Sequence, residues 1–141
     1  MIKTTSLIPV LALLSFAVQA QDANIAADPN RMKARIDALG EFGKNPQGGV
    51  SRIAYSDADI AGRRYITVLM RGAGLEVRVD TAGNLIGRRE GSEDGLPPIM
   101  IGSHIDSVPG GGNYDGDVGV IGAIEVAQLL HERGMVTRHP I

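Results

Sequence analysis

The 141-residue sequence contains no cysteine, which excludes a disulfide framework, a thiolate nucleophile and a cysteine-ligated zinc site. Any metal ion would therefore be held by His, Asp and Glu side chains. The sequence has no basic excess either, because 14 Lys and Arg against 16 Asp and Glu give a net charge of −2. Nucleic acid is therefore not an expected partner. With 43% hydrophobic and 21% charged residues, the composition excludes a disordered tail, a collagen and a coiled coil.

The first twenty residues have the pattern of a secretory signal peptide. Lys3 precedes an apolar run from Leu7 to Val18, and Val18-Gln19-Ala20 places small residues at the expected cleavage site before Gln21. A membrane anchor is the alternative, but this run is shorter than the roughly 20 residues of a spanning helix. We predict a signal peptide at 1–20, an exported protein that is periplasmic or secreted, and no membrane attachment of the mature form. Residues 21–30 are expected to be a flexible lead-in.

Two helices are predicted in the first half of the mature chain. Asp28-Pro29 is typical of an N-cap followed by proline in the first turn, and Gly40 is the expected end of that helix. Ser56 and Asp59 resemble a capping box at the start of a second helix, although Asp replaces the usual Glu. This second helix is expected to end near Gly72-Ala73-Gly74.

A β-hairpin is predicted after the second helix. Apolar and charged residues alternate from Leu75 to Asp80, which indicates a half-buried strand. A turn at Thr81–Asn84 leads into a second short strand at Leu85–Arg89.

Further along, Ile99-Met100-Ile101 predicts a strand that is buried on both faces. Asp117 is expected to cap a helix from Val118 to Leu130, which would stop at Gly134. Together these elements predict an α/β fold with a mixed sheet and flanking helices.

The residues between this strand and the third helix include a candidate metal site. His104 and Asp106 are two apart, so on a strand both side chains would point the same way while Ile105 faces the core. A neutral imidazole and a carboxylate suit a divalent ion such as Zn²⁺, or the carboxylate accepts the other ring N–H of a metal-binding histidine. The glycine-rich loop Gly110-Gly111-Gly112 lets Asp115 approach the same place.

Each feature of this segment also has a simpler interpretation. His104 and Asp106 could form a surface pair, and Asp115 could interact with the dipole of the following helix. The glycine loop could bind phosphate at a helix N-terminus, but it lacks the G-x-G-x-x-G and G-K-[ST] patterns. His131 and His139 have no partner that indicates a ligand.

Taken as a whole, the run GSHIDSVPGGGNYDGDVGVIGAIEVAQLL resembles the metal-binding segment of the M20 metallopeptidase-like amidohydrolases. More specifically, it is similar to the hydantoinase/carbamoylase branch: N-carbamoyl-L-amino acid hydrolases, β-ureidopropionases and allantoate amidohydrolases. Residues 56–63, 73–75 and 80–88 agree, so the resemblance covers essentially Arg31 to Ile141. It implies that 31–141 is the N-terminal portion of a truncated, zinc-exopeptidase-like catalytic domain.

The resemblance also implies roles for three residues. His104 matches a ligand of one metal ion, Asp115 an aspartate that bridges two, and Asp106 the catalytic aspartate beside the site. The implied cofactors are two divalent ions, with Zn²⁺ expected and Mn²⁺, Co²⁺ or Ni²⁺ as alternatives. The implied substrate is a small N-carbamoyl or ureido compound, whose linear C–N bond is hydrolysed.

Other parts of the family pattern would follow Ile141. These are a Glu-Glu pair that supplies the general base and a metal ligand, two further histidines, and the dimerisation domain through which full-length relatives form homodimers. Glu125 and Glu132 do not match that pair. We therefore expect an N-terminal fragment that is inactive alone. The alternatives are a fragment of an M20 aminopeptidase or dipeptidase, and a non-catalytic truncated remnant.

Overall fold

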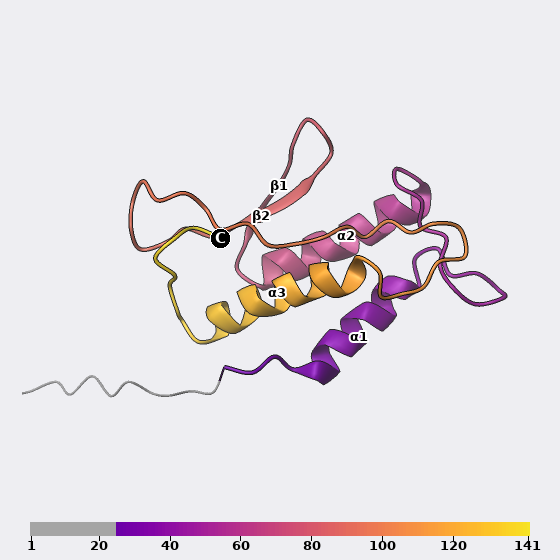
Figure 1. The fold of residues 1–141 in the computed structure, drawn as a ribbon, viewed down its shortest axis with the longest axis horizontal. Coiled ribbons are helices and arrows are strands. Elements are labelled where there is room, and N and C mark those ends of the chain that lie inside the picture. Colours follow the sequence, from indigo (N-terminus) through magenta and orange to yellow (C-terminus); the bar gives the residue numbers. More distant parts are fainter. Residues whose placement is uncertain (1–24) are drawn as a thin grey trace, which may run out of the picture.

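A computed structural model describes residues 25–141 of the chain, so the predicted signal peptide and most of the lead-in lie outside the described residues. The elements follow in the order α1 (Pro29–Gly40), α2 (Asp57–Gly72), β1 (Glu76–Val79), β2 (Leu85–Arg88) and α3 (Asp117–Glu132). Figure 1 shows the three helices close together, with the β1–β2 hairpin beside α2. None of the helices in this part of the chain is long and apolar enough to cross a membrane.

The starts of α1 and α2 agree with the local sequence signals. The Asp28 carboxylate accepts hydrogen bonds from the backbone N–H groups of Asn30 and Arg31, at 2.9 and 3.1 Å. At α2, the Ser56 hydroxyl accepts from the Asp59 N–H at 3.3 Å. The Asp59 carboxylate accepts from the N–H of Tyr55 at 2.9 Å, rather than from the cap residue as in a capping box. Both helix starts are confirmed, with this change at the second.

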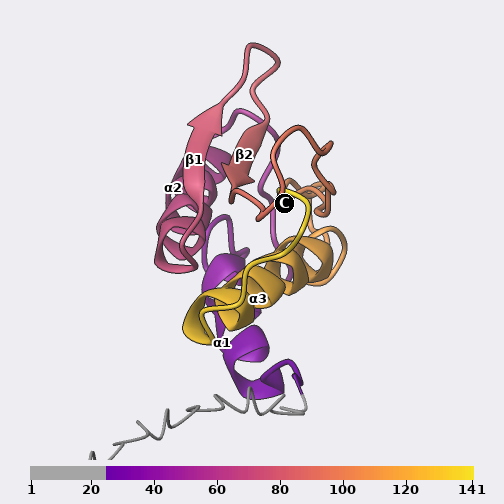
Figure 2. The same ribbon diagram turned by 90° about the vertical axis from the view of Figure 1, so that its left-hand side faces the viewer.

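The hairpin is also confirmed. β1 and β2 are antiparallel, with Val77 opposite Gly87 and Val79 opposite Leu85. The Asp80 carboxylate closes the turn by accepting from the N–H groups of Ala82 and Asn84, at 3.0 and 2.8 Å. Figure 2 shows the turn projecting beyond the helices.

The predicted strand at Ile99-Met100-Ile101 is wrong. These residues belong to no strand, and their exposed fractions are 52%, 88% and 51%. A backbone hydrogen bond joins the N–H of Ile99 to the carbonyl of Pro140 at 2.8 Å, but no ladder follows in residues 25–141. A buried strand needs partner strands at its edges and cover on both faces. The α/β class holds, but within the described residues the sheet consists of the antiparallel pair β1–β2 rather than a wider mixed sheet.

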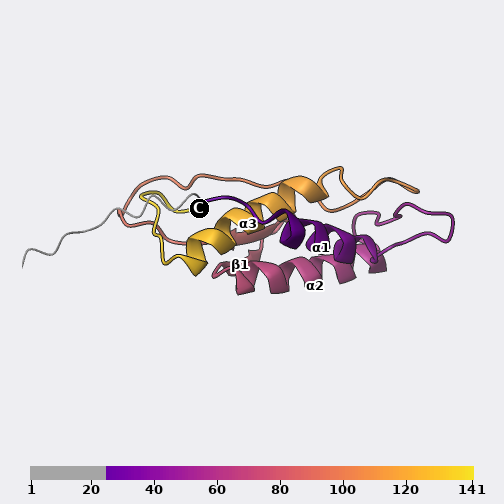
Figure 3. The ribbon, with the colours of Figure 1, turned by 90° about the horizontal axis from the view of Figure 1, so that it is seen from below.

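The core lies where α3 packs against α1 and α2. Figure 3, seen from below, shows the three helices adjacent to one another. The cluster of buried apolar side chains comes from the three helices and from the residue that follows α2: Ile36, Leu39, Ile66, Ala73, Val120, Ile121, Ile124 and Ala127. This core fixes α3, whose first turn borders the candidate site.

The predicted role of Asp117 as the N-cap of α3 is also wrong. Gly116, at φ 72°, occupies the cap position, and no side chain caps the helix there. Asp117 is the first residue of the helix, and its buried carboxylate pairs with Arg52 at 2.7 Å. The tertiary ion pair takes the carboxylate away from the local capping position.

Candidate metal site

The structure brings His104, Asp106 and Asp115 together. Nδ1 of His104 lies 3.2 Å from Oδ1 of Asp106, and Nε2 lies 3.8 Å from Oδ2 of Asp115. The imidazole thus has one carboxylate beside each ring nitrogen. Ile105, between the two paired residues, packs against the core as expected. The juxtaposition agrees with the sequence expectation, while the catalytic and metal-binding roles remain predictions.

The two ring nitrogens of His104 have different surroundings. Nδ1 faces both the carboxylate and the backbone carbonyl of Asp106, the latter at 3.1 Å. Because both partners are acceptors, this side favours the tautomer in which Nδ1 carries the proton. The Nε2 lone pair is then directed to the side where Asp115 lies. A carboxylate behind a histidine is the arrangement that orients a metal-binding imidazole in many zinc sites.

The distance between the two outer donors fits one divalent ion. Zinc lies about 2.0–2.2 Å from nitrogen and oxygen ligands, so two ligands of the same ion are separated by roughly 3–4 Å. The 3.8 Å between His104 Nε2 and Asp115 Oδ2 falls in this range. Residues 25–141 contain no group of three or more His, Cys, Asp or Glu side chains that could hold a metal. The described part of the chain therefore offers two donors, with Asp106 behind one of them.

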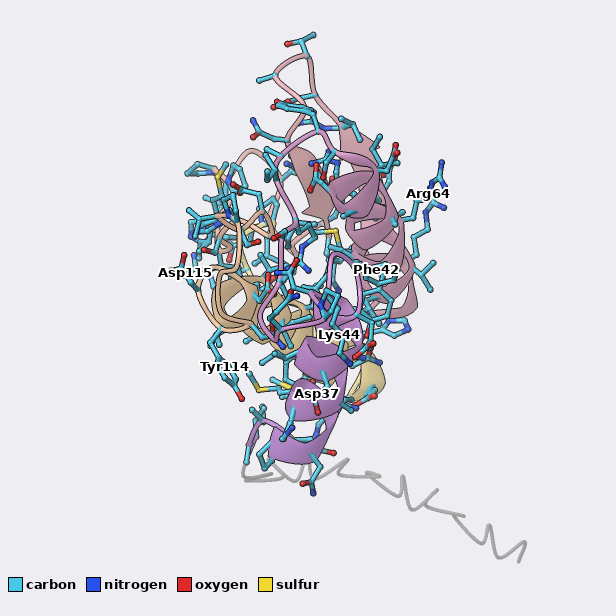
Figure 4. The ribbon with its side chains drawn as sticks, turned by 90° about the vertical axis from the view of Figure 1, so that its right-hand side faces the viewer. Asp37, Phe42, Lys44, Arg64, Tyr114 and Asp115 are labelled. Carbon is cyan, nitrogen blue, oxygen red and sulfur yellow. The ribbon has the colours of Figure 1, made fainter. Side chains whose placement is uncertain are left out.

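The site is open to solvent. The side chains of His104, Asp106 and Asp115 are 50%, 47% and 92% exposed. Figure 4 shows Asp115 and Tyr114 at the surface of the molecule on the side of α3, with their side chains pointing apart. His104 and Asp106 also line an open groove of about 920 Å³ between α2, the hairpin and α3. A groove of this size can accept a small molecule.

Gly116 allows the close approach of the His104 segment to the start of α3. Its φ of 72° is in the left-handed region that favours glycine. A Cβ at this position would collide with the backbone carbonyl oxygen of His104 and would lie 2.6 Å from Cε1 and 2.7 Å from Nδ1 of its ring, so the His104 segment would have to move. The glycine next to Asp115 is therefore required by the position of both the backbone and the ring of His104.

A buried arginine, which the sequence patterns do not predict, contacts both segments of this site. Arg52 lies in the loop between α1 and α2, and its guanidinium donates to the carbonyl of Ile105 at 2.5 Å and to both carboxylate oxygens of Asp117 at 3.0 and 2.7 Å. Burial raises the pKa of the Asp117 carboxyl group, and the hydrogen bonds from Arg52 oppose that rise. No local pattern indicates this contact, because Asp117 is 65 residues away in the sequence.

The other two histidines lie away from these residues. Nδ1 of His139 is 2.8 Å from the carbonyl of Pro97, and His131 is in the last turn of α3. The expectation that neither is a ligand remains a prediction.

The amino-acid sequence was compared with those of known proteins and protein families. No family model matches the chain. The sequence is 45% identical over 111 residues to an N-carbamoyl-L-amino acid amidohydrolase of Geobacillus stearothermophilus, covering 79% of this chain and 27% of the relative. It is 43% identical to a ureidoglycolate hydrolase of Arabidopsis thaliana, covering 79% and 24%. It is 41% identical to the allantoate amidohydrolase of Escherichia coli, covering 60% and 21%.

Solved structures that resemble this chain come from the same group of proteins as the relatives found by sequence. A hydantoinase/carbamoylase family amidase from Burkholderia vietnamiensis superposes with a TM-score of 0.80 at 40% identity, covering 84% of this chain and 29% of that structure. AtUAH in complex with glyoxylate gives a TM-score of 0.77 at 42% identity, covering 82% and 27%. This chain is homologous to the hydantoinase/carbamoylase family amidases. The resemblance inferred from the motifs is thereby confirmed.

The match to the hydantoinase/carbamoylase amidases is to their N-terminal part. The chain spans only about a quarter of the length of the curated relatives it matches. The three relatives are named for N-carbamoyl-L-amino acids, ureidoglycolate and allantoate, and none of these three is named as a peptidase.

Proposed function

We propose that this chain forms part of a metal-dependent hydrolase that cleaves linear C–N bonds in N-carbamoyl or ureido compounds. The supporting observation is the position of His104 between the carboxylates of Asp106 and Asp115. The relatives named for carbamoyl amino acids, ureidoglycolate and allantoate support the substrate class.

In this proposal, His104 Nε2 and the Asp115 carboxylate bind a divalent ion, for which Zn²⁺ is expected. A bound ion of this kind acts as a Lewis acid, which polarises a carbonyl group and makes a water molecule more acidic. Asp106 accepts a hydrogen bond from the Nδ1–H group and so holds the imidazole in the orientation that ligation requires. The groove beside His104 and Asp106 is the proposed place of the substrate.

A segment exchange tests this function. Residues 25–141 would replace the homologous segment of the Geobacillus stearothermophilus amidohydrolase, and hydrolysis of an N-carbamoyl-L-amino acid would be measured with added Zn²⁺, Mn²⁺ or Co²⁺. We expect the chimera to hydrolyse the substrate. Within it, His104→Ala should abolish turnover and lose bound metal, whereas His131→Ala, at the far end of α3, should retain both.

Two results would contradict the proposal. Unchanged turnover and metal content in the His104→Ala chimera would exclude the histidine as a ligand. A folded chimera that binds no metal and hydrolyses nothing would favour a non-catalytic remnant.

For the 141-residue chain alone, we expect no carbamoylase turnover with the same metals. The two donors His104 and Asp115 are fewer than the roughly three protein ligands of a catalytic zinc site. Measurable turnover that disappears in His104→Ala would overturn this expectation.

We also propose that residues 1–20 direct export to the periplasm or the medium. Expression in a Gram-negative host followed by fractionation and mass spectrometry should give a mature chain that begins at Gln21. Replacing Ala20 by Phe should block cleavage, because the processing site requires small residues. An intact chain in the cytoplasm would contradict this proposal.

A further inference from the structure

The guanidinium of Arg52 lies at the junction of the two segments that carry the proposed metal donors. Nε donates to the carbonyl of Ile105, the residue between His104 and Asp106, at 2.5 Å. Nη2 donates to the carboxylate of Asp117, two residues after Asp115. One side chain is thus hydrogen-bonded to both halves of the site.

The same arginine is fixed to the helical core. Nη1 donates to the carbonyl groups of Leu39 at 2.8 Å and Phe42 at 3.1 Å, at the end of α1. The Arg52 and Asp117 side chains are 1% and 2% exposed, so water cannot replace these contacts. A buried, fully hydrogen-bonded guanidinium is rigid, and its planar fork defines the directions of its partners.

The backbone around Arg52 adds to this arrangement. The Arg52 N–H donates to the Ser107 hydroxyl at 2.9 Å, and the Ser107 N–H donates to the Arg52 carbonyl at 2.8 Å. Further along the same two segments, Val50 and Gly111 exchange two backbone hydrogen bonds, both 2.8 Å long. The loop that carries Arg52 therefore follows the chain from Ile105 to Gly111, on the way from His104 to Asp115.

We propose that Arg52 is the positioning residue of this site: through the Ile105 carbonyl and the Asp117 carboxylate it sets the distance between His104 and Asp115. The proposal rests on the proposed function for the identity of the site. Arg52 itself touches neither the donors nor the groove. Its effect is on where the donors lie, so its loss should weaken metal binding without removing a ligand.

The test compares Arg52→Lys with Arg31→Lys in the full chain. Lysine keeps the charge, but its single ammonium cannot reach the Ile105 carbonyl and both oxygens of Asp117 in the geometry of the arginine fork. Arg31 is a matched control, because it also forms a bidentate ion pair with a buried carboxylate of α3. Its partner is Glu125. That pair lies two turns into the helix, away from His104.

The first readout is the affinity for Mn²⁺, which is measured by NMR from the broadening of backbone amide signals. The second readout is the chemical shift of the His104, Asp106 and Asp115 amide signals in the absence of metal. We expect Arg52→Lys to bind Mn²⁺ about 10-fold or more weakly, the usual effect of losing a group that orients a ligand. Its three amide signals should shift. Arg31→Lys should lose stability to urea but keep the wild-type affinity and signals.

Unshifted signals in Arg52→Lys, or an equal loss of affinity in Arg31→Lys, would overturn the positioning role. If Arg52→Lys does not fold, Asp117→Asn tests the same contact, and it should shift the Asp115 signal and weaken Mn²⁺ binding. His104→Ala separates the two proposals: if this variant binds Mn²⁺ like the wild type, the metal site is wrong. The metal-free signals of Arg52→Lys then still decide the positioning role.

Discussion

The hydrogen bonds of the buried Glu125 carboxylate predict how much stability the protein loses when this side chain is removed. It accepts hydrogen bonds from Nε and Nη2 of Arg31 at 2.8 and 2.7 Å, from Nη1 of Arg35 at 3.3 Å and from the N–H of Asp28 at 3.0 Å. All three partners belong to α1 or its cap, so this one side chain joins α3 to α1. The Glu125 side chain is only 1% exposed.

The expected loss follows from what remains after Glu125→Ala. Removing one partner of a fully buried ion pair costs about 3–5 kcal/mol, because the other charge is left without a partner. Arg31 and Arg35 are 26% and 13% exposed, so water partly solvates the freed guanidinium groups. We therefore expect the lower limit, about 3 kcal/mol. Glu125→Gln keeps one acceptor oxygen and should lose roughly half as much.

Urea unfolding followed by circular dichroism at the helix band measures both variants. Asp37→Ala is the control, since it removes the exposed Lys33–Asp37 pair on the surface of α1 and should leave the unfolding midpoint unchanged. If Glu125→Ala lowers the free energy of unfolding by less than about 1 kcal/mol, the cluster does not hold the helices together as reasoned.

Three further predictions concern acid, the core and the site. Hydrogen bonds from Arg31 are the main cause of the lowered pKa of Glu125. The ionised Glu125 carboxylate therefore contributes its full stabilisation of the fold above the ordinary pKa of 4.5, and this contribution is lost as the pH falls through the lower pKa of the folded state. Glu125→Gln should remove this part of the acid dependence in urea titrations. Ile121 is fully buried, so Ile121→Ala should lower the free energy of unfolding by about 3–4 kcal/mol in the same assay. A loss of less than about 1 kcal/mol would contradict the placement of Ile121 in the core. Gly116→Ala should cost about 2 kcal/mol through backbone strain and displace His104, seen as a shift of its amide signal; an unchanged signal would contradict the close contact.

The elements that the sequence predicts well are those that adjacent residues determine. The cap at Asp28, the end of α1 at Gly40 and the Asp80 turn all depend on contacts within four residues. The alternation that indicates the hairpin has the same local origin. The two-residue spacing of His104 and Asp106 likewise predicts that both side chains lie on one side, as observed.

The errors arise where distant contacts decide the conformation. Ile99-Met100-Ile101 has the composition of a buried strand, but composition does not supply the neighbouring strand that a ladder needs. Asp117 has the residue type of a helix cap, yet Arg52 takes its carboxylate into the interior. The approach of His104 to Asp115 also needs the turn at Gly116, whose φ the residue type permits but does not specify.

The central claim is that His104 Nε2 and Asp115 bind the same divalent ion. The most direct measurement is a Zn²⁺ titration of the chain, followed by the ¹⁵N signals of the three histidine rings. We predict that Nε2 of His104 shifts while the rings of His131 and His139 do not, and that Asp115→Asn weakens this response. A His104 ring that does not respond to Zn²⁺, or an unchanged response in Asp115→Asn, would contradict the claim.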